Sequence, residues 1–72
     1  MTHQVASTET TDEGTVYVLS NGESVVVRAD GSSRCRNIHG RNLANTGRFA
    51  QSCQAMRQAV RRFVAIEQMR QP

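Results

Sequence analysis

Residues 15–29 read TVYVLSNGESVVVRA, in which two runs rich in strand-forming residues lie on either side of Asn21-Gly22. This arrangement predicts a β-hairpin, because Asn and Gly tolerate the positive φ angles that both central positions of a type I′ turn require. A two-residue loop places Ser20 opposite Glu23 and so determines which side chains share a face. One face of the hairpin then carries four valines: Val16, Val18, Val25 and Val27. The opposite face carries three apolar residues: Tyr17, Leu19 and Val26.

A third strand is expected to follow the hairpin. Asp30-Gly31 is a second turn motif, and the alternation in RCRNIHGR favours a short strand over about residues 34–39. Different loop lengths would give this strand different registers, and an irregular connection is the alternative. Residues 40–47, GRNLANTG, have the composition of a loop, with Leu43 reaching back to the core.

The last third of the chain is expected to form a helix over about residues 46–70. Asn45 or Thr46 can cap its first turn, and Pro72 prevents its continuation. Six residues fall within one stripe about 100° wide on a helical projection, which predicts the side that faces the core. They are Phe49, Cys53, Met56, Val60, Phe63 and Val64.

Together these elements predict an α+β fold. An antiparallel β-hairpin or three-stranded sheet, about residues 14–39, would pack its valine face against one C-terminal helix, about residues 46–70. Residues 1–13 contain five Ser or Thr, three acids and no apolar period, so they are expected to be a disordered tail before a single domain over residues 14–72. No secretory signal or membrane span is evident in the sequence, so we expect a cytoplasmic protein without a membrane partner.

The chain of 72 residues has one Tyr, two Phe and no Trp, so its core must be small. One helix shields only one side of a sheet, so Tyr17, Leu19 and Val26 would face water together in a monomer. They are therefore predicted to be a protein interface, most simply in a homodimer. The alternatives are a tail that covers Tyr17 through Val5, or a different protein partner. A smaller apolar strip on the helix offers a rival surface: Ala55, Ala59 and Ile66.

All nine basic residues are arginine, and the formal net charge is +3. A genome rich in G and C explains this usage without a function, whereas the planar guanidinium also suits phosphate contacts. The segment RCRNIHGRNLANTGR, residues 34–48, holds four arginines and no acid, so it is predicted to contact nucleic acid, whether DNA or RNA. Two helix arginines are included in the prediction. The predicted nucleic-acid-binding residues are Arg34, Arg36, Arg41, Arg48, Arg57 and Arg61.

The sequence indicates neither a metal site nor a catalytic site. Cys35, His39 and Cys53 lack the paired spacing of zinc ligands, and Cys53 falls on the core stripe of the helix. No Ser-His-acid set, Cys-His set or phosphate-binding loop is suggested by the spacing. We therefore expect a non-enzymatic binding module without a cofactor.

Two functional hypotheses are compatible with these features. The first is a nucleic-acid-binding module, and the alternative is a phage-encoded inhibitor or adaptor that docks on a larger protein. The layout of strands followed by a helix is similar to that of some sheet-reading DNA-binding domains. It is also similar to that of small phage inhibitors of host defence such as anti-CRISPR proteins, so the layout supports either hypothesis.

Overall fold

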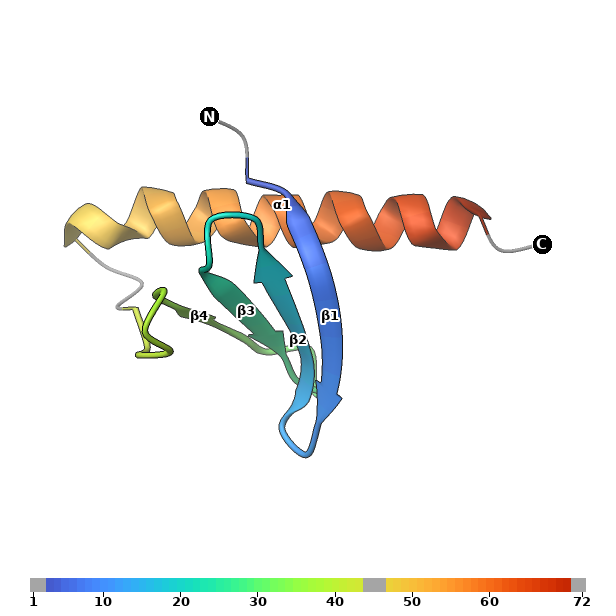
Figure 1. Cartoon of the computed structure of the whole chain (residues 1–72), viewed down its shortest axis with the longest axis horizontal. Coiled ribbons are helices and arrows are strands. Elements are labelled where there is room, and N and C mark those ends of the chain that lie inside the picture. The colour runs from blue at the N-terminus through green and yellow to red at the C-terminus, as the bar shows by residue number, and fades with distance from the viewer. Residues whose placement is uncertain (1–2, 44–46, 71–72) are drawn as a thin grey trace.

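The computed structural model describes residues 3–43 and 47–70, apart from the side chain of Arg48. It shows a four-stranded antiparallel sheet with the strands in chain order, and one long helix that crosses behind the strands (Figure 1). The elements are β1 (Val5–Thr11), β2 (Gly14–Leu19), β3 (Ser24–Val27), β4 (Ser33–Arg36), a 3₁₀ turn η1 (Gly47–Phe49) and α1 (Ala50–Arg70). The predicted α+β fold with one C-terminal helix is therefore confirmed. The predicted caps Asn45 and Thr46, and Pro72, lie outside the described residues.

The expected disordered tail is wrong over most of its length, because residues 5–11 form β1 and pair with β2. Thr8 lies opposite Tyr17 in this ladder, which has one bulge between Val5 and Ser7. The segment is rich in threonine, a β-branched residue that favours strands. It lacks an apolar alternation because it is an edge strand whose side chains are mostly exposed. The polar composition of residues 5–11 therefore gave no indication of a strand in the sequence.

Three successive turns share one geometry, and each ends in a glycine: Gly22, Gly31 and Gly40. In each turn the glycine N–H donates to the carbonyl three residues earlier at 2.9–3.0 Å, and the residue before the loop donates its N–H across the loop at 2.8 Å. These glycines have φ between 81° and 95°, whereas no described non-glycine residue has a positive φ. Each loop therefore has three residues, a type I turn closed by a left-handed glycine. The glycines recur every nine residues.

The three-residue loop that ends at Gly22 makes the predicted hairpin register wrong by one residue. Tyr17, and not Val18, lies opposite Val25. The predicted type I′ turn would need a positive φ at Asn21, which Asn21 does not have. Its side-chain oxygen instead accepts the backbone N–H two residues later at 3.0 Å. Because side chains alternate along a strand, this shift moves the side chains of β2 to the opposite face relative to those of β3.

The prediction that Tyr17, Leu19 and Val26 face water together is wrong for the same reason. Leu19 is 1% exposed within the core, and Tyr17 packs edge-to-face on Phe63 of α1 with ring centroids 6.1 Å apart. Val26 is 0% exposed and alternates with Val25, so it lies on the face away from the helix. These three predicted interface residues therefore neither share a face nor project together into water.

The core lies between α1 and the sheet face that carries Leu19, Val25 and Cys35. From the predicted helix stripe, Cys53, Met56 and Val60 are buried there. The stripe is less accurate at its ends, since Val64 is only partly buried and Phe49, in η1, is 39% exposed. Of the four valines expected beneath the helix, Val25 and Val27 contribute to the core. The other two, Val16 and Val18, alternate onto the opposite face.

Candidate nucleic-acid interface

The sheet face opposite α1, called the open face below, carries arginines along β3 and β4. Arg34 pairs with Val26 across the ladder, which places its side chain on this face. Arg36, two residues further along β4, projects to the same side. Arg28 continues the alternation one residue beyond β3, where its N–H donates to the Ser32 carbonyl at 2.8 Å. Three arginines from neighbouring strands therefore share the open face.

Arg36 is paired with an acid from a distant turn. Its guanidinium lies 2.9 Å from a carboxylate oxygen of Glu13, in the turn between β1 and β2. The contact spans the open face from β4 to that turn, so the sheet curls towards this side. Val26, at the centre of the curl, has no exposed surface although no helix covers it. The two charged side chains are 28% and 52% exposed, so their pairing contributes at most about 1 kcal/mol.

Gly14, at the start of β2, makes this curl possible. A Cβ atom added there would lie 2.2 Å from the backbone oxygen of Val27, and the φ of Gly14 is +145°. The backbones of β2 and β3 therefore approach each other more closely than any side chain at this position would allow. This close approach brings the turn that carries Glu13 towards the arginine of β4.

Arg41 extends the basic surface into the loop after β4. Asn37 organises this loop, because its side-chain oxygen accepts the N–H groups of His39 and Arg41, both at 2.9 Å. Asn42 then bridges back to Arg36. The loop therefore returns along the outer edge of β4 and leaves the Arg41 side chain exposed there.

The helix arginines of the predicted interface lie behind the sheet. The Arg57 Nε donates to the Ser33 hydroxyl at 2.8 Å, and an Arg57 terminal nitrogen donates to the Ser33 carbonyl at 3.4 Å. Arg57 is half-buried, and its hydrogen bonds to Ser33 link α1 to the start of β4. Arg61 lines a groove on the helix side of the sheet. The six predicted residues therefore do not form one surface, and the side chain of Arg48 lies outside the described part of the chain.

Sequence reasoning missed Arg28, because it lies outside the basic segment of residues 34–48. The alternation of side chains along β3 and β4 is the pattern that identifies it, since Arg28 and Val26 lie two residues apart. This pattern becomes usable only after the register of the two strands is known.

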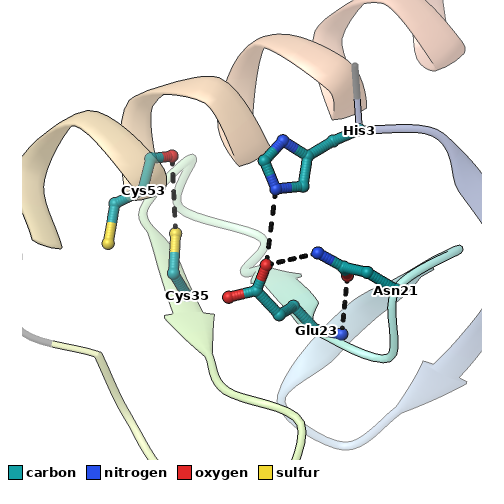
Figure 2. A network of polar contacts seen from close by, with 5 residues as sticks. All are labelled: His3, Asn21, Glu23, Cys35 and Cys53. Carbon is teal, nitrogen blue, oxygen red and sulfur yellow. Dashed lines mark hydrogen bonds and ion pairs between the residues drawn. The ribbon is translucent and has the colours of Figure 1, made fainter. Parts of the chain in front are cut away.

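The two cysteines lie between β4 and α1, within the core (Figure 2). The Cys35 sulfur donates to the Cys53 carbonyl at 3.7 Å, and both residues are buried, as predicted for Cys53. Burial raises the pKa of the Cys35 thiol to about 11. The thiol is therefore protonated at neutral pH, and a thiol is a much weaker nucleophile and metal ligand than a thiolate.

A polar network ties the start of the described chain to the turn between β2 and β3 (Figure 2). The His3 Nε2 lies 3.4 Å from a carboxylate oxygen of Glu23, and the same oxygen accepts a hydrogen bond from the Asn21 side chain at 2.6 Å. Glu23 precedes Ser24 in the alternation, so its side chain lies on the helix side of the sheet, away from the arginines of the open face.

Comparison with known proteins adds nothing to this geometry: no protein-family model, no curated protein and no solved structure matches the chain. Within residues 3–43 and 47–70, no helix is both long enough and apolar enough to cross a membrane. The functional assignment therefore rests on the geometry and charge of the open face.

Proposed function

We propose that this protein binds the phosphate backbone of a nucleic acid through the open face of β3 and β4. The supporting observation is that Arg28, Arg34 and Arg36 share one sheet face that no helix covers, with Arg41 exposed in the next loop. This surface is formed mainly by the basic segment that the sequence singles out, with Arg28 added by the fold.

Arginine suits this role because its planar guanidinium presents parallel donors to phosphate oxygens. The carboxylate of Glu13 already occupies such a position beside Arg36. Because that ion pair is open to solvent, replacing the carboxylate by a phosphate sacrifices at most about 1 kcal/mol. Each arginine that neutralises a phosphate releases counterions, so binding should be strongest at low salt.

The positions of the aromatic residues favour a duplex over a single strand. Surfaces that bind single strands commonly stack bases on exposed aromatic side chains. Tyr17 and Phe63 instead contact each other on the helix side of the sheet, and Phe49 lies at the start of the helix. The open face therefore offers arginines on β3 and β4, with Glu9 at its β1 side, and neither Tyr17 nor Phe63 as a stacking platform. A pair of strands fits the major groove of B-form DNA.

Fluorescence anisotropy with a short random-sequence DNA duplex, titrated at several salt concentrations, tests the proposal. Arg34→Gln is expected to weaken binding about three- to tenfold and to reduce the slope of log K against log salt by about 1. Arg61→Gln is the matched control, because it removes the same charge from an exposed position behind the sheet. It should leave the affinity nearly unchanged.

Three results would contradict the proposal. A greater loss of DNA affinity for Arg61→Gln than for Arg34→Gln would place the contact on the helix. Tighter binding of a single strand than of the duplex would exclude the preference for duplex DNA. If neither probe binds at low salt, the protein does not bind nucleic acid in this way, and docking on a larger protein becomes the better hypothesis.

A further inference from the structure

The outer edge of β1 is unpaired within the described chain. β1 is the longest strand of the sheet, with seven residues, and it pairs only with β2. Its sequence, VASTETT, contains no Pro, Lys or Arg, which are residues that commonly block pairing at a sheet edge. The bulge lies at its start, so residues 7–11 form an uninterrupted run. This edge therefore offers its backbone donors and acceptors to another strand.

The C-terminal part of α1 projects past the same edge (Figure 1). Every residue from 65 to 70 is exposed, and the apolar side chains Ile66 and Met69 are 51% and 84% exposed. Of the smaller apolar strip expected on the helix, Ile66 is thus accessible, whereas Ala59 is buried. A groove of about 400 Å³ lies where the helix passes the start of β1. It is lined by Gln4, Val5, Ala59, Arg62, Phe63 and Ile66.

The two ends of this edge differ in charge. Glu9 lies near the end of β1, and the turn that follows adds Asp12 and Glu13. At the start of β1 the neighbouring part of the helix carries Arg62, and Arg70 follows in its last turn, 4.0 Å from a carboxylate oxygen of Glu67. One end of the edge is therefore acidic, and the other lies beside an apolar helix end that carries two arginines and one acid.

We propose that β1 pairs antiparallel with β1 of a second copy of this chain, about a twofold axis near Thr8. Thr8 is the central residue of the strand, so this register places Val5 of one copy opposite Thr11 of the other. The two sheets become one continuous sheet of eight strands. A twofold axis suits this edge, because each copy then contributes the acidic end to one half of the interface and the end beside the helix arginines to the other half.

The same arrangement covers the projecting part of each helix. α1 crosses its own sheet at the start of β1, which lies beside the end of β1 in the second copy. Ile66 and Met69 therefore pack over the helix-side threonines of the second copy, Thr10 and Thr15. The acidic turn of each copy reaches the helix arginines of the other, with Asp12 placed to pair with Arg62. Backbone pairing, apolar burial and opposite charges thus support one interface.

Sedimentation equilibrium between low and high micromolar concentration tests this dimer independently of DNA binding. The open-face arginines lie on β3 and β4, whereas the proposed contact lies at β1, the other edge of the sheet. Wild-type protein should be dimeric at the upper concentrations. Thr8→Lys places two like charges opposite each other at the axis and should raise the dimer Kd by about tenfold or more. Gln54→Lys, at an exposed position in the first half of α1, adds the same charge as a control and should leave the Kd unchanged.

Further variants test the placement of the helix. Met69 is too exposed to affect the fold of a monomer, so Met69→Glu should weaken the dimer while the circular dichroism spectrum stays the same. Asp12→Arg and Arg62→Glu should each raise the Kd, and their combination should restore it.

Several results would overturn the proposal. One is a wild-type chain that remains monomeric at high micromolar concentration. Another is a dimer that survives Thr8→Lys, which would exclude pairing through the β1 edge whatever the effect of Met69→Glu. Failure of the Asp12 and Arg62 charge exchange to restore the Kd would exclude the proposed register.

Discussion

The two edges of this sheet are built in opposite ways. β4 has four residues, carries arginines, and is followed by a loop that returns along its outer edge, where the Leu43 N–H donates to the Cys35 carbonyl at 2.8 Å. β1 has seven residues, carries no basic side chain, and has no described segment outside it. A covered edge leaves its side chains as the means of contact, whereas an uncovered edge offers its backbone. One small sheet can therefore present two different kinds of binding surface.

The largest effect on stability is expected from disturbing the attachment of β1 and β2 to the rest of the sheet. Gly14→Ala would place a Cβ atom 2.2 Å from the Val27 backbone oxygen, so it should lower the free energy of unfolding by about 3 kcal/mol. Gly31→Ala is the matched control, since Gly31 also has a positive φ but no atom within 4 Å of the added Cβ. Gly31→Ala should lower the free energy of unfolding by about 1–2 kcal/mol. Urea denaturation measures both, and equal losses would show that the approach at Gly14 is not tight.

A somewhat smaller effect on stability is expected when the pH is raised, and it comes from Cys35 in β4, the covered edge strand. The pKa of Cys35 is raised from 9.0 to about 11 by burial, so the unfolded chain loses this proton at lower pH than the folded chain does. The contribution of this thiol to the free energy of unfolding is therefore fully present below about pH 9. It is lost as the pH rises through about 11, by about 2–3 kcal/mol in all.

The corresponding measurement is the free energy of unfolding between pH 7 and pH 11 for the wild type and for Cys35→Ala. The variant should be less stable at neutral pH, because it leaves a cavity, but its stability should depend less steeply on pH. Identical slopes for the two proteins would show that the Cys35 thiol is not the group responsible.

A third and smaller effect is expected from uncovering β4. Leu43 is partly buried against the core, so Leu43→Ala should cost about 1–2 kcal/mol. It should also speed hydrogen exchange at the residue-43 amide, which is the group that bonds to β4. Ile38→Ala, in the same loop but 61% exposed, should change stability by less than about 0.5 kcal/mol. Unchanged exchange in Leu43→Ala would mean that this side chain does not hold the loop on β4.

The smallest change in stability, within about 0.5 kcal/mol, is expected for Glu13→Gln, because the ion pair with Arg36 is exposed. The same substitution should raise the affinity for duplex DNA about two- to fivefold, since it frees Arg36 and removes a negative charge from the open face. Anisotropy and urea denaturation of the same sample separate these two quantities. A lower affinity would show that Glu13 positions Arg36 for binding and does not compete with the phosphate.

The elements of this fold could be predicted from the sequence more reliably than the faces they bury. Cys53, Met56 and Val60 follow from the helical period alone, which does not depend on the length of any loop. The hairpin faces do depend on it, because Asn21-Gly22 suits a two-residue loop and also a three-residue loop. A difference of one residue in the loop decides which side of the strand meets the helix.

The candidate site likewise contains residues that a local sequence pattern identifies and contacts that no such pattern reveals. Arg34, Arg36 and Arg41 can be identified from the density of arginine in their segment, whichever way the strands face. The contact of Arg57 with Ser33 joins residues 24 positions apart, so no local pattern reveals it. β1 was missed because strand prediction relies on apolar alternation, and an exposed edge strand does not need it.

The nine-residue spacing of Gly22, Gly31 and Gly40 also has a consequence for the order in which the chain folds. Three-residue loops join β2 to β3 and β3 to β4, and two residues join β1 to β2. Each strand therefore pairs with its neighbour in sequence, so hairpin closure sacrifices little chain entropy and occurs within microseconds. We expect the strands to assemble one after another, with each new strand pairing on the one before it. The contacts of α1 with the sheet join distant parts of the chain, so docking of the helix should be the slow, rate-limiting event.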